Sequence, residues 1–102
     1  ALILSNDWEL YGDGSGDFAA PKGLAVDSAG HVYVVDALFD AVQIFDRDGA
    51  FLLSFGERGS QSGQFWLPAG LFIGPQDQIY VADAYNRRIQ VFALGPDKQA
   101  DK

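Results

Sequence analysis

The segment from Gly63 to Phe92 reads GQFWLPAGLFIGPQDQIYVADAYNRRIQVF, and the same pattern occurs once before it. Moved back by 47 positions, it aligns without a gap with Gly16 to Phe45, which reads GDFAAPKGLAVDSAGHVYVVDALFDAVQIF. The two copies are identical at 11 of 30 positions, among them a phenylalanine, a proline, a glycine and an aspartate at fixed places. A period of roughly 40–50 residues indicates a chain built from two copies of one structural unit.

Each copy is expected to form a small antiparallel sheet. Short runs rich in β-branched and aromatic residues predict strands, and Asp27–Gly30 and Asp46–Gly49 are typical tight turns that end in a glycine with positive φ. The strands are predicted at residues 21–26, 31–36, 41–45 and 50–55 of the first copy and at 70–73, 78–83 and 88–92 of the second. No segment has the periodicity of a helix, so the predicted fold class is all-β.

The second copy lacks a fourth strand, because a polar tail follows at its place. Ala1–Ser5 resembles Ala50–Ser54 and supplies a strand of the missing type at the other end of the chain. We therefore divide the single domain into four parts. They are a fourth-type strand and loop (1–15), a first repeat (16–62), a second repeat without its fourth strand (63–95) and the polar tail (96–102).

Composition narrows the functional classes. The chain has 102 residues, of which 48% are apolar, and this suits one small globular domain. Its net charge of −7 repels a phosphate backbone, which disfavours nucleic-acid binding. The chain contains no cysteine, so it has neither disulfides nor thiolate metal sites. No apolar run approaches the roughly 20 residues of a membrane helix, so no membrane span is predicted.

The chain begins at Ala1 without an initiator methionine. We therefore expect that it has been processed or cut from something longer. Removal of a signal peptide, which would place the protein outside the cell or in the periplasm, is preferred over proteolysis or a boundary chosen for expression.

Four short antiparallel strands in a repeat of this length are typical of a β-propeller blade. The runs GDFAAPKGLAVD, GHVYVVDA and VQIFDRDG resemble the NHL repeat, and YVADAYNRRIQVF in the second copy resembles it more closely. The first copy departs from the family at Leu38–Ala41, where a polar pair such as Asn86-Arg87 is usual, and the second departs at Gly74-Pro75. The resemblance implies blades of a ring, which in this family usually has six.

Two blades do not close a ring, because each blade packs both of its faces on neighbours. Two bare faces would lose on the order of 10 kcal/mol at about 25 cal/mol per Å², which is comparable with the stability of a whole domain. We therefore expect either a homotrimer of six blades, in which Ala1–Ser5 pairs with Arg88–Phe92 of the next copy, or a complementary chain that carries the missing blades.

Apolar residues that are predicted to lie in loops are the best candidates for a binding site. They are Leu38, Phe39, Trp66 and Tyr85, with Arg87 and Arg88 as polar neighbours. Aromatic residues are favoured at protein contacts, and an apolar patch on one rim of the ring would mark a protein or ligand site. The alternative is that these side chains fold onto a blade edge and extend the core.

Other polar residues favour structural roles. Asp36 and Asp83 end equivalent strands and are expected to cap the backbone of the turn that follows. Residues 13–17 alternate oxygen ligands as a calcium loop would, but the downstream glutamate is missing, so a flexible connection is preferred. His31, the one histidine, is expected at an exposed strand start, because a metal site needs several ligands.

The sequence contains no nucleophile–base pair, no phosphate-binding glycine loop and no clustered metal ligands, so no catalytic residue, metal or cofactor is predicted. We expect a non-enzymatic propeller scaffold that binds a protein, peptide or other ligand, a role that the resemblance to the NHL family supports. Two alternatives stay open. One is a metal-dependent lyase or hydrolase that uses the central channel, and the other is a designed or excised minimal propeller without an evolved ligand.

Overall fold

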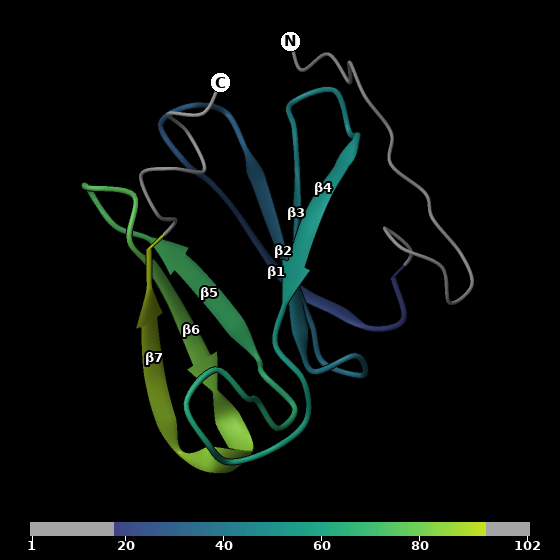
Figure 1. Ribbon diagram of the computed structural model, residues 1–102, viewed down its shortest axis with the longest axis vertical. Helices are drawn as coiled ribbons and strands as arrows, with labels where there is room; N and C mark the ends of the chain where they lie inside the picture. Colours follow the sequence, from purple (N-terminus) through teal and green to yellow (C-terminus); the bar gives the residue numbers. More distant parts are fainter. Residues whose placement is uncertain (1–17, 94–102) are drawn as a thin grey trace, which may run out of the picture.

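The computed structural model describes residues 18–93. Within this range the chain forms seven strands and one short 3-10 helix. The elements are β1 (Pro21–Val26), β2 (Val32–Asp36), β3 (Ala41–Phe45), β4 (Phe51–Phe55), β5 (Gly70–Ile73), β6 (Ile79–Asp83), η1 (Ala84–Asn86) and β7 (Arg88–Phe92). They build two antiparallel sheets, β1-β2-β3-β4 and β5-β6-β7 (Figure 1). The predicted all-β class is confirmed, and we call the two sheets blade 1 and blade 2.

Three strands begin one residue later than predicted, because the preceding residue closes a turn. The backbone N–H groups of Asp27, Asp46 and Gly74 donate to the carbonyl oxygens of His31, Ala50 and Gln78 at 3.0, 2.9 and 2.8 Å. Gly30 and Gly49 take the positive φ predicted for their turns, at 92° and 93°. The strand predicted at residues 1–5, the loop that includes 13–17 and the tail at 96–102 lie outside the described residues.

The two blades pack through their first strands. β1 and β5 lie beside each other at the centre of Figure 1. A Cβ atom added to Gly23 of β1 would lie 3.3 Å from the Cα atom of Gly70 in β5. These two glycines occupy the same position of the repeat. The glycine at position 23 therefore lets the backbone of blade 1 approach that of blade 2 closely.

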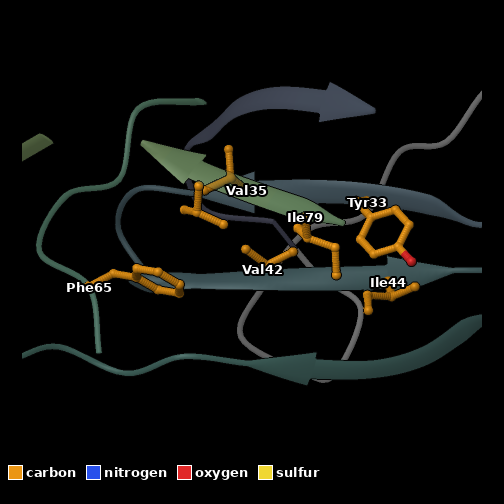
Figure 2. Packing of buried hydrophobic residues seen from close by; sticks show 7 residues of the cluster. Tyr33, Val35, Val42, Ile44, Phe65 and Ile79 are labelled. Carbon is orange, nitrogen blue, oxygen red and sulfur yellow. The ribbon is translucent and has the colours of Figure 1, made fainter. Parts of the chain in front are cut away.

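The hydrophobic core lies between the blades. Its fully buried members are Tyr33, Val35, Val42, Ile44, Phe65, Ile79 and Val81, most of which are labelled in Figure 2. Side chains alternate between the faces of a strand, so each blade contributes one face to this core. Blade 1 contributes the face that carries Tyr33 and Val42, and blade 2 contributes the opposite one, which carries Ile79 and Val81.

We name these faces by their residues. The leading face carries Gly23, Ala25, Tyr33, Val35, Val42 and Ile44 in blade 1, and Gly70, Phe72, Tyr80, Ala82, Ile89 and Val91 in blade 2. The trailing face carries Leu24, Val26, Val32, Val34 and Phe45 in blade 1, and Leu71, Ile73, Ile79, Val81 and Phe92 in blade 2. The core is thus formed by the leading face of blade 1 and the trailing face of blade 2.

Candidate protein-binding rim

Turn 37–40, loop 56–69 and η1 lie at the same end of the blades, the lower end in Figure 1. We call this end the rim and include Arg87, which follows η1. The Leu67 N–H donates to Asp40 Oδ1 at 2.7 Å, and Arg58 Nε lies 2.9 Å from Asp40 Oδ2. The Tyr85 N–H donates to the Trp66 carbonyl at 3.2 Å. These contacts join the segments from both blades into one continuous surface.

Phe65 anchors loop 56–69 in the core between the blades. Its side chain is fully buried, and its ring centroid lies 5.8 Å from that of Phe92 and 6.2 Å from that of Phe55. The ring also lies against Gly56, where a Cβ atom would come within 2.5 Å of it and where φ is 106°. Gly56 therefore meets two demands at once, a left-handed backbone and space for the Phe65 ring.

The carboxylate of Asp83 also fixes loop 56–69. It is fully buried and accepts hydrogen bonds from the Trp66 N–H at 2.8 Å, from Asn86 Nδ2 and Arg88 Nε at 2.9 Å each, and from Gln90 Nε2 at 3.3 Å. Burial raises the pKa of Asp83, but the hydrogen bonds and the charge of Arg88 outweigh it and leave the pKa below its usual value. The residue is therefore a charged anchor for the rim.

The predicted turn cap is confirmed for Asp36 and wrong for Asp83. Asp36 Oδ1 accepts from the N–H groups of Leu38 and Phe39 at 3.1 and 3.2 Å, but Asp83 makes no side-chain hydrogen bond to the η1 backbone. The polar side chains of Asn86 and Arg88 occupy its oxygens instead.

The role that both aspartates share was missed from the sequence. Each accepts the N–H of a residue 17 positions earlier, Ala19 at 2.7 Å for Asp36 and Trp66 at 2.8 Å for Asp83. Each aspartate thus binds the segment that leads into the first strand of its own blade. A signal for this was present, because Ala19 and Trp66 are also equivalent positions of the repeat.

Trp66 and Tyr85, two of the predicted binding residues, are brought together. Their ring centroids are 5.2 Å apart and their planes meet at 57°. Both side chains stay exposed, at 43% and 59%. Trp66 comes from loop 56–69 and Tyr85 from η1, so the spacing of the two residues in the sequence did not predict the contact. An exposed pair of packed rings offers a partner a large apolar surface with little side-chain entropy to lose.

The other apolar candidates and Arg87 lie on the same rim. Leu38 is 60% exposed and Phe39 is half-buried, both on turn 37–40. Arg87 is exposed and adopts a left-handed φ of 56°, with its N–H donating to the Ala84 carbonyl at 3.1 Å. The rim therefore combines apolar side chains with two exposed arginines, Arg87 and Arg58, of which Arg58 pairs with Asp40.

Arg88 differs from its neighbour Arg87. Besides its contact with Asp83, its Nη2 donates to the carbonyl oxygens of Gln61 and Gln64 at 2.9 Å each. Gln90 Nε2 donates to the same Gln64 carbonyl at 2.7 Å. These contacts give Arg88 a structural role in fixing loop 56–69, a role that the sequence did not indicate.

At the opposite end of blade 1, His31 belongs to a small polar cluster. Its Nδ1 lies 2.9 Å from Asp27 Oδ2, which also accepts the Tyr33 hydroxyl at 2.8 Å. Burial raises the pKa of Asp27, but the bonds from Tyr33 and His31 outweigh it and lower the pKa overall. Burial and the bond to Asp27 raise the pKa of Tyr33. The expectation of an exposed His31 is wrong, because Asp27 draws the ring into this cluster and leaves it half-buried.

Within residues 18–93, no three histidine, cysteine, aspartate or glutamate side chains gather as metal ligands. No helix in this part of the chain is long and apolar enough to cross a membrane. The calcium-like segment 13–17 lies outside the range.

Known proteins with similar sequences agree with the repeat. Protein brain tumor of Drosophila melanogaster is 37% identical over 51 residues, and Protein lin-41 of Caenorhabditis elegans is 46% identical over 41 residues. These matches cover 50% and 40% of this chain but 5% and 4% of the relatives, so the chain corresponds to a small part of either protein. The family model of the NHL repeat matches residues 65–92. The resemblance in the sequence is therefore confirmed, and residues 65–92, which include all of blade 2, match the NHL repeat.

Proposed function

We propose that this chain is a non-enzymatic propeller scaffold that binds a protein or peptide through the rim. The observation that carries the proposal is the exposed Trp66–Tyr85 pair. Leu38 and Arg87 lie on the same rim and would extend the contact. Aromatic residues and arginine are the types that dominate binding energy at protein interfaces.

The way the rim is held supports the proposal. Asp83 and Arg88 fix the backbone beside Trp66, and Asp40 binds the N–H of the next residue, Leu67. A surface that is already ordered loses little conformational entropy when it binds. The polar contacts below the rim thus prepare the aromatic pair for a partner.

The chemistry of the rim indicates the kind of segment it would bind. The rings of Trp66 and Tyr85 suit an apolar or aromatic side chain. Arg87 suits a carboxylate, which its planar guanidinium can bind with two parallel hydrogen bonds. We propose a peptide segment with an apolar anchor next to an acidic residue.

The scaffold that we propose is a ring to which this chain contributes two blades. A homotrimer would supply six blades, and a complementary chain that carries the missing blades is the alternative. The exposed apolar faces of both blades support a larger assembly, since monomers rarely expose apolar patches of this kind. The division into repeats at residues 16–62 and 63–95 and a location outside the cytoplasm stay predictions.

A displayed library of random peptides, selected on the immobilised protein, would test the rim. Selected peptides should share an apolar anchor near an acidic residue and should bind the double variant Trp66→Ser/Tyr85→Ser at least about tenfold more weakly. Arg87→Ser should weaken binding a few-fold. Its matched control is Arg47→Ser, which changes an exposed arginine on the turn at the opposite end of blade 1 and should leave affinity unchanged. Peptides that bind the double variant as tightly as the wild type would contradict the proposal.

A further inference from the structure

Within residues 18–93, the leading face of blade 1 and the trailing face of blade 2 cover each other, whereas the other two faces carry exposed apolar side chains. On the leading face of blade 2, Phe72, Ile89 and Val91 are 63%, 65% and 55% exposed. On the trailing face of blade 1, Leu24 and Val26 of β1 are 61% and 53% exposed, while Val34 and Phe45 on the next two strands are buried. We propose that a second copy of this chain packs the trailing face of its blade 1 onto the leading face of blade 2. The proposal rests on the ring described above and names the partner that continues it.

The first argument is that the chain already contains the interface. The leading face of blade 1 packs on the trailing face of blade 2. Because the blades are copies of one sequence, a second copy can repeat this packing with the faces that remain. Such contacts are head-to-tail and close into a ring when the rotation between copies divides a full turn.

The second argument is the space beside Gly70. At the equivalent Gly23, an added Cβ would meet the Cα of Gly70 at 3.3 Å and the backbone nitrogen of Leu71 at 3.5 Å. At Gly70, an added Cβ would meet nothing within 4 Å. Gly70 has no positive φ that would require glycine. A glycine at this place therefore suits the close approach of another first strand, which a second copy would provide.

The third argument is side-chain volume. Compared with its covered equivalent, one exposed face has larger side chains and the other has smaller ones. The leading face of blade 2 has Phe72 where blade 1 has Ala25, so it is fuller. The trailing face of blade 1 has Val26 and Val32 where blade 2 has isoleucine, so it is emptier. Close packing requires that a gain in volume on one side be met by a loss on the other. The two remaining faces of this chain meet that requirement.

Native mass, measured by light scattering and native mass spectrometry, tests the proposal. The wild-type chain should assemble, and a six-bladed ring would have three times the 11.0 kDa of one chain. Gly70→Leu should block the leading face of blade 2, and Leu24→Asp should block the trailing face of blade 1. Each variant alone should be monomeric, whereas a mixture should form a 1:1 dimer through its one intact pair of faces. The matched control Gln76→Leu adds a leucine to the exposed turn between β5 and β6 and should assemble like the wild type.

Three results would overturn the proposal. They are a wild-type monomer, an assembly that neither variant disrupts, and variants that stay monomeric when mixed. Circular dichroism of each variant verifies folding, and if one variant is unfolded alone, the 1:1 dimer in the mixture is still the required result. Peptide binding to the rim, measured on monomeric Gly70→Leu, separates the two proposals, because the aromatic pair lies within one chain. Loss of assembly with retained binding affects only this inference, and the reverse result affects only the proposed function.

Discussion

Blade 1 and blade 2 have nearly the same apolar pattern but opposite surroundings. On the leading face, Val42 of blade 1 is fully buried, while its equivalent Ile89 is 65% exposed. On the trailing face the order reverses in the first strand, where Leu24 of blade 1 is 61% exposed and its equivalent Leu71 is half-buried. Val34 and Phe45, on the other strands of that face in blade 1, are buried. The burial of residues such as Val42 and Leu71 thus depends on whether another blade packs on them. The type of residue depends on its position in the repeat. Equivalent residues can therefore be changed in pairs to learn what a neighbouring blade contributes.

The largest difference is expected between Phe65→Ala and Phe18→Ala. Phe65 is fully buried between the blades, whereas Phe18 is half-buried and has a ring contact with Phe45 at 5.5 Å. In the Gly70→Leu background, where we expect no second copy, Phe65→Ala should lower the free energy of unfolding by about 3–5 kcal/mol. Phe18→Ala should cost about 1–2 kcal/mol. Urea denaturation measures both, and equal losses would mean that the blades are covered alike.

A second pair compares the repeated aspartates. Asp83→Asn removes the charge that faces Arg88, whereas the Asp36 carboxylate accepts the backbone N–H groups of Ala19, Ala20, Leu38 and Phe39. Asp83→Asn should cost about 2–4 kcal/mol, because it leaves a half-buried guanidinium without its counter-charge. Asp36→Asn should cost about 1–2 kcal/mol. The same urea titrations measure the difference, and restoration by Asp83→Asn/Arg88→Gln would identify the unpaired charge as the cause.

Acid should affect both blades through their lowered carboxyl pKa values. Asp27 and Asp83 have pKa values below the usual 3.8. Their stabilising effect is therefore complete above about pH 4 and is lost as the pH falls through the lowered values. Urea midpoints should be constant from about pH 7 to 5 and should decline below about pH 4. Asp83→Asn should flatten that decline, and an unchanged acid limb would show that other groups control it.

The smallest expected difference is between Tyr33→Phe and Tyr80→Phe. The Tyr33 hydroxyl donates to Asp27, but blade 2 has Gly74 at the place of that aspartate. Removal of the hydroxyl should cost about 1 kcal/mol in blade 1 and close to nothing in blade 2. Thermal unfolding of the two variants against the wild type resolves such a difference. A larger effect of Tyr80→Phe would reveal a hydroxyl contact that only blade 2 makes.

The strands were predictable because local and repeated signals agree. Runs such as Val32–Asp36 combine β-branched residues with a closing turn, and the second copy repeats them 47 positions later. Even the glycine at positions 23 and 70 was visible as an identity. Its reason was not, because the approach of two first strands depends on the packing of the blades.

The rim was predictable in its residue types and not in its geometry. Loop placement of Trp66 and Tyr85 followed from the turn pattern, but their contact depends on how loop 56–69 folds over η1. Arg87 and Arg88 looked equivalent as neighbours in sequence. Their roles differ because Arg87 ends η1 with a left-handed backbone, while Arg88 begins β7 and donates to carbonyl oxygens of loop 56–69.

Loop 56–69 has a consequence for how the chain unfolds. It extends β4 of blade 1, yet Asp83, Asn86 and Arg88 bind it to blade 2. In linear repeat arrays, a terminal repeat can fray while the rest stays folded. Here blade 2 cannot open without releasing the segment that continues the last strand of blade 1. The two blades thus share one cooperative unit, and amide hydrogens in β4 and β7 should exchange through the same opening event.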